Sequence, residues 1–94
     1  MEELVQQRLA AMLAQPADKL RLLPACFEEV VILEGRKTKV TTYCQTRGNR
    51  RWLIIQAAQE RLGGIAAKVI ASGYELSDSG NPRKLAADEL YDYT

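Results

Sequence analysis

The first fifteen residues carry apolar side chains at helical spacing. Val5, Leu9, Met12 and Leu13 follow one another at intervals of four, three and one, which gathers them on one stripe of a helix. Proline restricts the residue before it and suits the first position of a helix, so a proline can end one helix and begin the next. We therefore expect one helix over Glu2–Gln15 and a shorter one over Pro16–Leu23, with Leu20 and Leu23 facing inward.

From Phe27 onward the pattern becomes that of strands. The β-branched runs Val30–Leu33 and Lys39–Tyr43 are separated by the turn-prone Gly35, which predicts a hairpin. Gly48-Asn49 suits a two-residue hairpin loop, which requires positive φ, and Trp52–Ile55 would form a central third strand. Alternation in the second strand predicts one buried face with Val40, Thr42 and Cys44, and one wet face with Lys39, Thr41, Tyr43 and Gln45.

After Gln56 the chain is rich in alanine, and Ala58, Leu62, Ile65 and Val69 are spaced four, three and four apart. This spacing predicts a helix over about 57–72, which Gly63-Gly64 either breaks or brings close to another backbone. Gly73 would close it in the left-handed conformation. A short edge strand at 74–76 and a loop at 77–82 follow. The end of the chain is either a helix over Pro82–Tyr91, with Leu85 and Leu90 inward, or a mobile terminus.

The resulting prediction is one α+β domain spanning residues 1–94. Its small antiparallel meander has three to four strands and is packed by N-terminal, central and C-terminal helices. Three strands between helices resemble, in topology only, the α-β-β-β-α order of double-stranded-RNA-binding domains. Those modules place a lysine cluster at the start of the last helix, where this chain has Gln56, Ala57, Ala58 and Gln59. The resemblance therefore implies an order of elements and no RNA-binding site.

Composition indicates an ordinary folded protein, with 47% hydrophobic and 27% charged residues. The acidic start MEEL does not resemble a secretory signal, and no apolar run approaches the roughly 18 residues of a membrane span. We therefore expect a cytoplasmic protein in which Cys26 and Cys44 are reduced. The chain contains no histidine, so it lacks the common structural zinc sets of four Cys or His ligands. We expect no metal and no cofactor.

Charge is unevenly distributed along the chain. Six basic residues and no acid lie within 36–51, so the formal net charge of +1 divides into +6 there and −5 elsewhere. The six are Arg36, Lys37, Lys39, Arg47, Arg50 and Arg51. They would either contact phosphates, with Tyr43 or Trp52 stacking on bases, or act as solvated turn residues that protect sheet edges. In an up-and-down meander these residues divide between two ends.

Catalytic chemistry finds little support in the sequence. Without histidine the chain lacks the usual acid and base that work near neutral pH. Cys44 has no histidine to activate it as a nucleophile, so we interpret it as a small buried apolar residue on the core face of its strand. Tyr91 and Tyr93 lie beside acids near the end of the chain and would contact a partner or close the domain's own core. We therefore predict a non-enzymatic module that binds protein, with a homodimer as one form. The alternative is a nucleic-acid-binding module using the basic meander.

Overall fold

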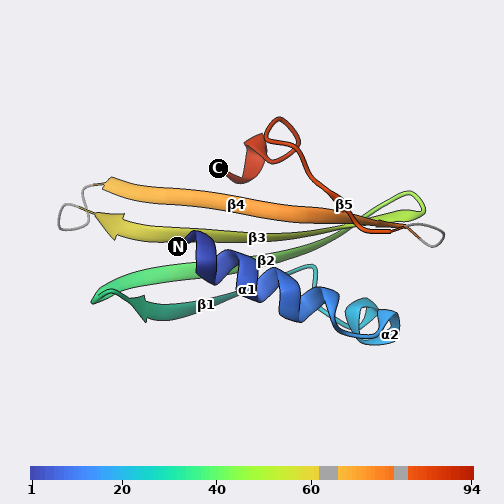
Figure 1. Cartoon of the computed structure of the whole chain (residues 1–94), viewed down its shortest axis with the longest axis horizontal. Coiled ribbons are helices and arrows are strands. Elements are labelled where there is room, and N and C mark those ends of the chain that lie inside the picture. The colour runs from blue at the N-terminus through green and yellow to red at the C-terminus, as the bar shows by residue number, and fades with distance from the viewer. Residues whose placement is uncertain (62–65, 78–80) are drawn as a thin grey trace.

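The computed structural model describes residues 1–61, 66–77 and 81–94 as an α+β protein built on one antiparallel five-stranded sheet with two helices (Figure 1). The strand order is β1-β2-β3-β4-β5, an uninterrupted meander. No helix in the described ranges has the length and apolar character needed to cross a membrane. The elements, in chain order, are α1 (Glu2–Leu13), α2 (Ala17–Arg21), β1 (Cys26–Leu33), β2 (Arg36–Arg47), β3 (Arg50–Arg61), β4 (Ala66–Ser77), β5 (Arg83–Lys84) and the 3-10 turn η2 (Tyr91–Tyr93).

The two hairpins predicted at Gly35 and Gly48-Asn49 are confirmed. Glu34 and Gly35 both have positive φ, of 54° and 75°, which is the conformation that a tight hairpin with right-handed twist requires. Gly48 turns β2 into β3 with a φ of 63°. The strands these turns join are long, with twelve residues each in β2 and β3, so the molecule measures 46 × 26 × 20 Å.

One face of the sheet, which we call the helix face, is covered by α1. Val5 and Leu9 are each 1% exposed and pack against the sheet residues Val40, Leu53 and Ile55. These are the inward positions that the helical spacing of residues 2–15 predicts. The predicted second helix is also present in shortened form, with Leu20 buried as expected. Figure 1 shows α1 lying across the strands and α2 at the end of the sheet near the β2–β3 turn.

The opposite face, which we call the tail face, is partly covered by the C-terminal tail (residues 81–94). After β5 the chain turns back and places Leu85, Leu90 and Tyr93 against Ile54, which is fully buried. Leu85 and Leu90 face inward as predicted, but they do so from irregular structure. The helix predicted over Pro82–Tyr91 is wrong: β5 and η2 are the regular elements in that part of the chain.

The central helix predicted over about 57–72 is also wrong, because the described parts of this segment belong to β3 and β4. Ala58 and Val69, which helical spacing placed on one stripe, are instead direct partners across the β3–β4 ladder. Alanine's helix preference is worth less than the continuous pairing of β3 with strands on both sides, so tertiary context decides. Leu62, Ile65 and the question of Gly63-Gly64 lie outside the described residues. Without this helix the α-β-β-β-α order is absent.

Two predictions at the end of this segment change with it. Gly73 does not end a helix but lies within β4, and residues 74–76 are strand as predicted, although they belong to the twelve-residue β4 and not to a separate short strand. A Cβ on Gly73 would lie 2.6 Å from the Leu53 carbonyl oxygen, so glycine permits close approach here. β2 does not have one wet face, since Thr41 on its tail face is 4% exposed. Of the predicted loop at 77–82, residues 78–80 lie outside the described residues.

Candidate functional site

The six basic residues of the meander do not share one surface. Arg36 and Lys37 lie at the β1–β2 turn, at the opposite end of β2 from Arg47 and from the first residues of β3, Arg50 and Arg51. Side chains alternate between faces along a strand. Alternation places Arg51 on the helix face with Leu53, whereas Arg47 and Arg50 project to the tail face. The six basic residues are therefore separated between the two ends of β2 and between the two faces of the sheet.

Three of these cations have partners on the tail face. Lys39 forms a salt bridge of 3.4 Å with Glu28 on the neighbouring strand. The Arg47 guanidinium lies over the Trp52 ring, 4.1 Å from its centroid, which is a cation–π contact. Arg50 donates to the Glu75 carboxylate at 3.0 Å. Half of the six basic residues therefore have a partner within the sheet itself.

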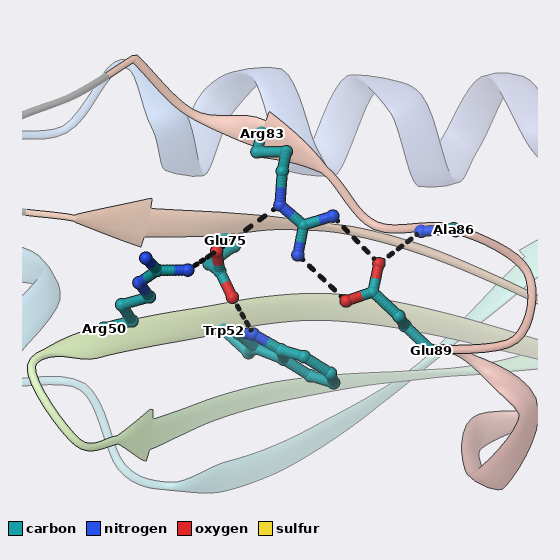
Figure 2. A network of polar contacts seen from close by, with 6 residues as sticks. All are labelled: Arg50, Trp52, Glu75, Arg83, Ala86 and Glu89. Atoms are coloured by element: carbon teal, nitrogen blue, oxygen red, sulfur yellow. Dashed lines mark hydrogen bonds and ion pairs between the residues drawn. The ribbon is translucent and has the colours of Figure 1, made fainter.

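A polar network fastens the tail to the sheet (Figure 2). Glu75 on β4 accepts hydrogen bonds from Arg50, from the Trp52 indole at 2.8 Å and from Arg83 at 3.4 Å. Arg83 also donates two hydrogen bonds to Glu89, of 3.0 and 2.8 Å, and Glu89 accepts a third from the Ala86 amide. Bidentate guanidinium–carboxylate pairing of this kind is directional and fixes the geometry of both groups.

Both carboxylates of this network are more acidic than usual. The hydrogen bonds from Arg83 and from the Ala86 amide lower the pKa of Glu89 from its ordinary value of 4.5 to about 2. The pKa of Glu75 is also lowered, chiefly because the Trp52 indole and Arg83 donate to its ionised form. Both groups are therefore ionised at neutral pH and hold the tail through charge-assisted contacts.

The two tail tyrosines separate into different roles. Tyr93 is 9% exposed, and its hydroxyl donates to the Gln45 side chain at 2.5 Å. Its ring meets that of Tyr43 edge to face, with 5.0 Å between centroids. Tyr91 is 78% exposed. Of the two explanations left open by the sequence, closing the domain's own core describes Tyr93, while Tyr91 belongs to the surface.

The two cysteines project from opposite faces of the sheet. Cys26 pairs in register with Tyr43 and shares the tail face, whereas Cys44 lies on the helix face beside Leu53. Burial raises the pKa of the Cys44 thiol, which favours its protonated form. No group of three metal-ligating side chains of the Cys, Asp or Glu type occurs among residues 1–61, 66–77 and 81–94.

A cleft that sequence reasoning missed lies beside the β2–β3 turn. Its volume is about 280 Å³, and both Arg21 of α2 and Arg51 of β3 line it. The remaining lining residues are Leu20, Thr46, Gly48, Asn49, Arg50, Leu76 and Ser77. Thr46, Arg51 and Leu76 are register neighbours on three adjacent strands and form the sheet side, while α2 supplies the other wall. The sequence signal for Arg21 was weak, since a basic residue ending a short helix is common.

The border strand β1 presents a second surface. Val30 and Ile32 are 63% and 66% exposed on the tail face, which the tail does not cover at this side of the sheet. The Cys44 amide donates to the Ala25 carbonyl at 2.9 Å, so odd-numbered residues of β1 direct their backbone groups toward β2. Even-numbered residues, including Glu28, Val30 and Ile32, therefore direct theirs away from the sheet.

The opposite border of the sheet is better protected. β5 pairs with Tyr74 and Glu75, and the Leu85 amide donates to the Gly73 carbonyl, so this end of β4 is closed. Farther along β4, Lys68 is a charged residue of the kind that discourages edge pairing. A hollow of about 470 Å³ lies here between α1 and the tail. The more open of the two borders is that of β1.

Comparison with known proteins gives no relative for this chain: no protein-family model, no curated protein and no solved structure matches it significantly.

Proposed function

We propose that this chain is a small non-enzymatic protein-binding module that pairs with a second copy of itself through the border of β1. The observation that carries the proposal is the combination of outward backbone groups and exposed apolar side chains, Val30 and Ile32, on one border strand. Strand addition uses these two features together, because backbone hydrogen bonds supply affinity and alternate side chains supply specificity.

The sequence of β1 is complementary to itself in antiparallel pairing. With Val30 opposite Val30 of the second copy, each Glu28 faces an Ile32 and each Phe27 faces a Leu33. No like charges are opposed in this register. A shift that set Glu29 opposite its own copy would oppose two carboxylates, which is unfavourable. A two-fold axis through Val30 is the symmetry of the commonest oligomers.

Charge also favours this register. Lys37 is the β2 partner of Ile32 and lies on the tail face, so it would stand two strand spacings, about 10 Å, from Glu28 of the second copy. A lysine side chain can cover most of that distance. Each Glu28 would then lie between Lys39 of its own chain and Lys37 of the other, with the two Val30 side chains at the centre.

Analytical ultracentrifugation tests the proposal directly. We expect a monomer–dimer equilibrium that Val30→Pro weakens by at least about tenfold, because proline removes an outward amide donor and leaves β1–β2 bonds intact. Tyr91→Ala changes an exposed ring elsewhere and serves as the matched control, with no expected effect on association. A chain that stays monomeric at high concentration, or a Val30→Pro variant that dimerises normally, contradicts the proposal.

Amide hydrogen exchange gives a second, residue-specific readout. In the dimer the amides of Glu28, Val30 and Ile32 would be protected at high protein concentration and would exchange freely on dilution. The amides of Glu29 and Val31, which face β2, provide the internal control because their protection should not depend on concentration. Concentration-independent exchange at all five positions would contradict strand addition at β1.

The alternative function is nucleic-acid binding through the six basic residues of Arg36–Arg51. These residues do not share one surface, which weakens this alternative. Counterion release would make any such binding fall steeply with salt. Binding of mixed-sequence RNA and DNA at low and near-physiological salt, compared with an Arg47→Ala/Arg50→Ala/Arg51→Ala variant, tests it. Equal weak binding by both proteins would remove this alternative.

A further inference from the structure

The cleft between α2 and the β2–β3 turn concentrates positive charge from separate elements. Arg21 of α2 and Arg51 of β3 line it from the two sides, and Arg50 also contributes to the lining. Arg50 is partly neutralised by Glu75. Within residues 1–61, 66–77 and 81–94, no carboxylate forms a salt bridge with Arg21 or Arg51. Two arginines from different elements that line one cleft, with no carboxylate salt-bridged to either in that part of the chain, favour an anion.

The other lining groups narrow the chemistry of that anion. Thr46 adds a hydroxyl donor on the same face of the sheet as Arg51, and Leu20 and Leu76 add apolar surface. A phosphate group has three peripheral oxygens and can accept from several donors at once, which matches guanidinium groups combined with a hydroxyl. Apolar surface combined with a few polar or charged groups is the usual composition of a small-molecule site.

The size of the cleft bears on the class of ligand. A volume of about 280 Å³ lies near the lower limit of small-molecule pockets, so it accommodates a compact molecule rather than a length of nucleic acid. The basic residues that a longer polyanion would need, Arg36 and Lys37, lie at the far end of β2. We propose that this cleft binds a small molecule through its phosphate group, with Arg21 and Arg51 as the principal ligands. This site is independent of dimer formation at β1.

Nuclear magnetic resonance titration of the full chain with pyrophosphate tests the site. We expect saturable, one-to-one shifts at the amides of Gly48, Asn49 and Ser77, well above those caused by sodium chloride or acetate at equal ionic strength. Arg21→Gln and Arg51→Gln should each weaken pyrophosphate binding by about tenfold or more, because each removes a charged donor. Circular dichroism of each variant confirms that it is folded.

Arg36→Gln is the matched control, since it removes one exposed arginine at the other end of β2 and should leave pyrophosphate affinity unchanged. Shifts no larger than those with chloride would overturn the proposal, as would equal weakening by Arg36→Gln. A single-stranded oligonucleotide forms a separate arm. If it binds more tightly than pyrophosphate and loses affinity with Arg36→Gln as well, the basic residues act together on a polymer and the small-molecule site is overturned.

Discussion

The two faces of the sheet are closed by different kinds of contact. On the helix face, α1 buries Val5 and Leu9 against Leu53 and its neighbours, a cluster held mainly by apolar area. On the tail face, a smaller apolar cluster around Ile54 is supplemented by the network of Glu75, Arg83 and Glu89. The helix face is therefore held by apolar packing, whereas the tail face combines a smaller apolar cluster with charge-assisted contacts.

The two faces also differ in how much of their area is covered by the rest of the chain. The tail covers the tail face around Ile54, where Leu85 and Tyr93 pack, and leaves the β1 side with Val30 and Ile32 exposed. The helix face has no comparable apolar exposure along β1, where Val31 is half-buried against the core. The surface proposed for association is therefore the part of the tail face that the tail does not cover.

The largest expected effect is on the helix face. Leu53 is 1% exposed at the centre of its cluster, and Leu53→Ala should lower the free energy of unfolding by about 4 kcal/mol because it leaves a cavity. Ile32→Ala removes a similar number of carbon atoms from an exposed position and should change stability by less than about 0.5 kcal/mol. Urea denaturation of both variants gives the difference. Equal losses would show that the apolar cluster does not dominate stability.

The next effect tests the tail face with two tyrosines two residues apart. Tyr93→Ala removes a buried ring and its hydrogen bond to Gln45, and should cost about 3 kcal/mol. Tyr91→Ala removes a ring that is 78% exposed and should cost nothing measurable. Thermal melts followed by circular dichroism compare them. A stable Tyr93→Ala variant would mean that the tail is a loose end rather than part of the core.

The helix face could be predicted from sequence to a large extent, whereas on the tail face the inward positions of Leu85 and Leu90 could be predicted but not the contacts that hold the tail. The spacing of Val5 and Leu9 identifies the buried stripe of α1 because a helix imposes a 3.6-residue period that local sequence alone reveals. The glycines at Gly35 and Gly48 likewise identify the hairpins, since positive φ is a local requirement. These signals do not depend on what packs against them.

The failures concern features that depend on distant partners. Residues 57–72 are rich in alanine, which favours a helix, but residues 57–59 pair with β2 and residues 66–72 pair with β3. This pairing is a tertiary effect that spacing cannot reveal. The cleft at Arg21 needs α2 to dock beside the β2–β3 turn, across thirty positions of sequence from Arg51. The tail network needs Glu75 and Glu89 to meet Arg83 through an irregular turn that has no periodic signature.

A smaller loss of stability is expected from a substitution at Gly73 of β4, which lies close to both Leu53 of β3 and Leu85 of the tail. Gly73→Ala would place its Cβ 2.6 Å from the Leu53 carbonyl oxygen and 3.1 Å from a methyl group of Leu85, so the strand or the tail must shift. Overpacking of this kind should cost about 2 kcal/mol. The loss should appear in urea denaturation together with faster exchange of the Leu85 amide, which donates to Gly73. An unchanged exchange rate at Leu85 would show that the tail does not depend on this close approach.

The smallest effect is the pH dependence of the tail network. The pKa of Glu89 is lowered to about 2 in the folded chain, from an ordinary 4.5, so its ionised form stabilises the fold above about pH 4.5 and this contribution is lost as pH falls toward 2. Glu75, whose pKa is also lowered, acts in the same direction. Trp52 donates to Glu75 and is the single tryptophan, so its fluorescence reports on the network.

Acid titration of that fluorescence should therefore show a transition between about pH 4.5 and 2, while far-ultraviolet circular dichroism of the sheet and α1 changes little over the same range. Glu89→Gln replaces the carboxylate with a neutral amide of the same size, and it should weaken attachment of the tail at pH 7 and reduce the amplitude of the transition. Glu60→Gln changes an exposed carboxylate that the structure places in no hydrogen bond or salt bridge among the described residues, and serves as the control. If wild type and Glu89→Gln gave the same acid profile, the charge-assisted contacts would not be what holds the tail, and the two faces would differ in packing alone.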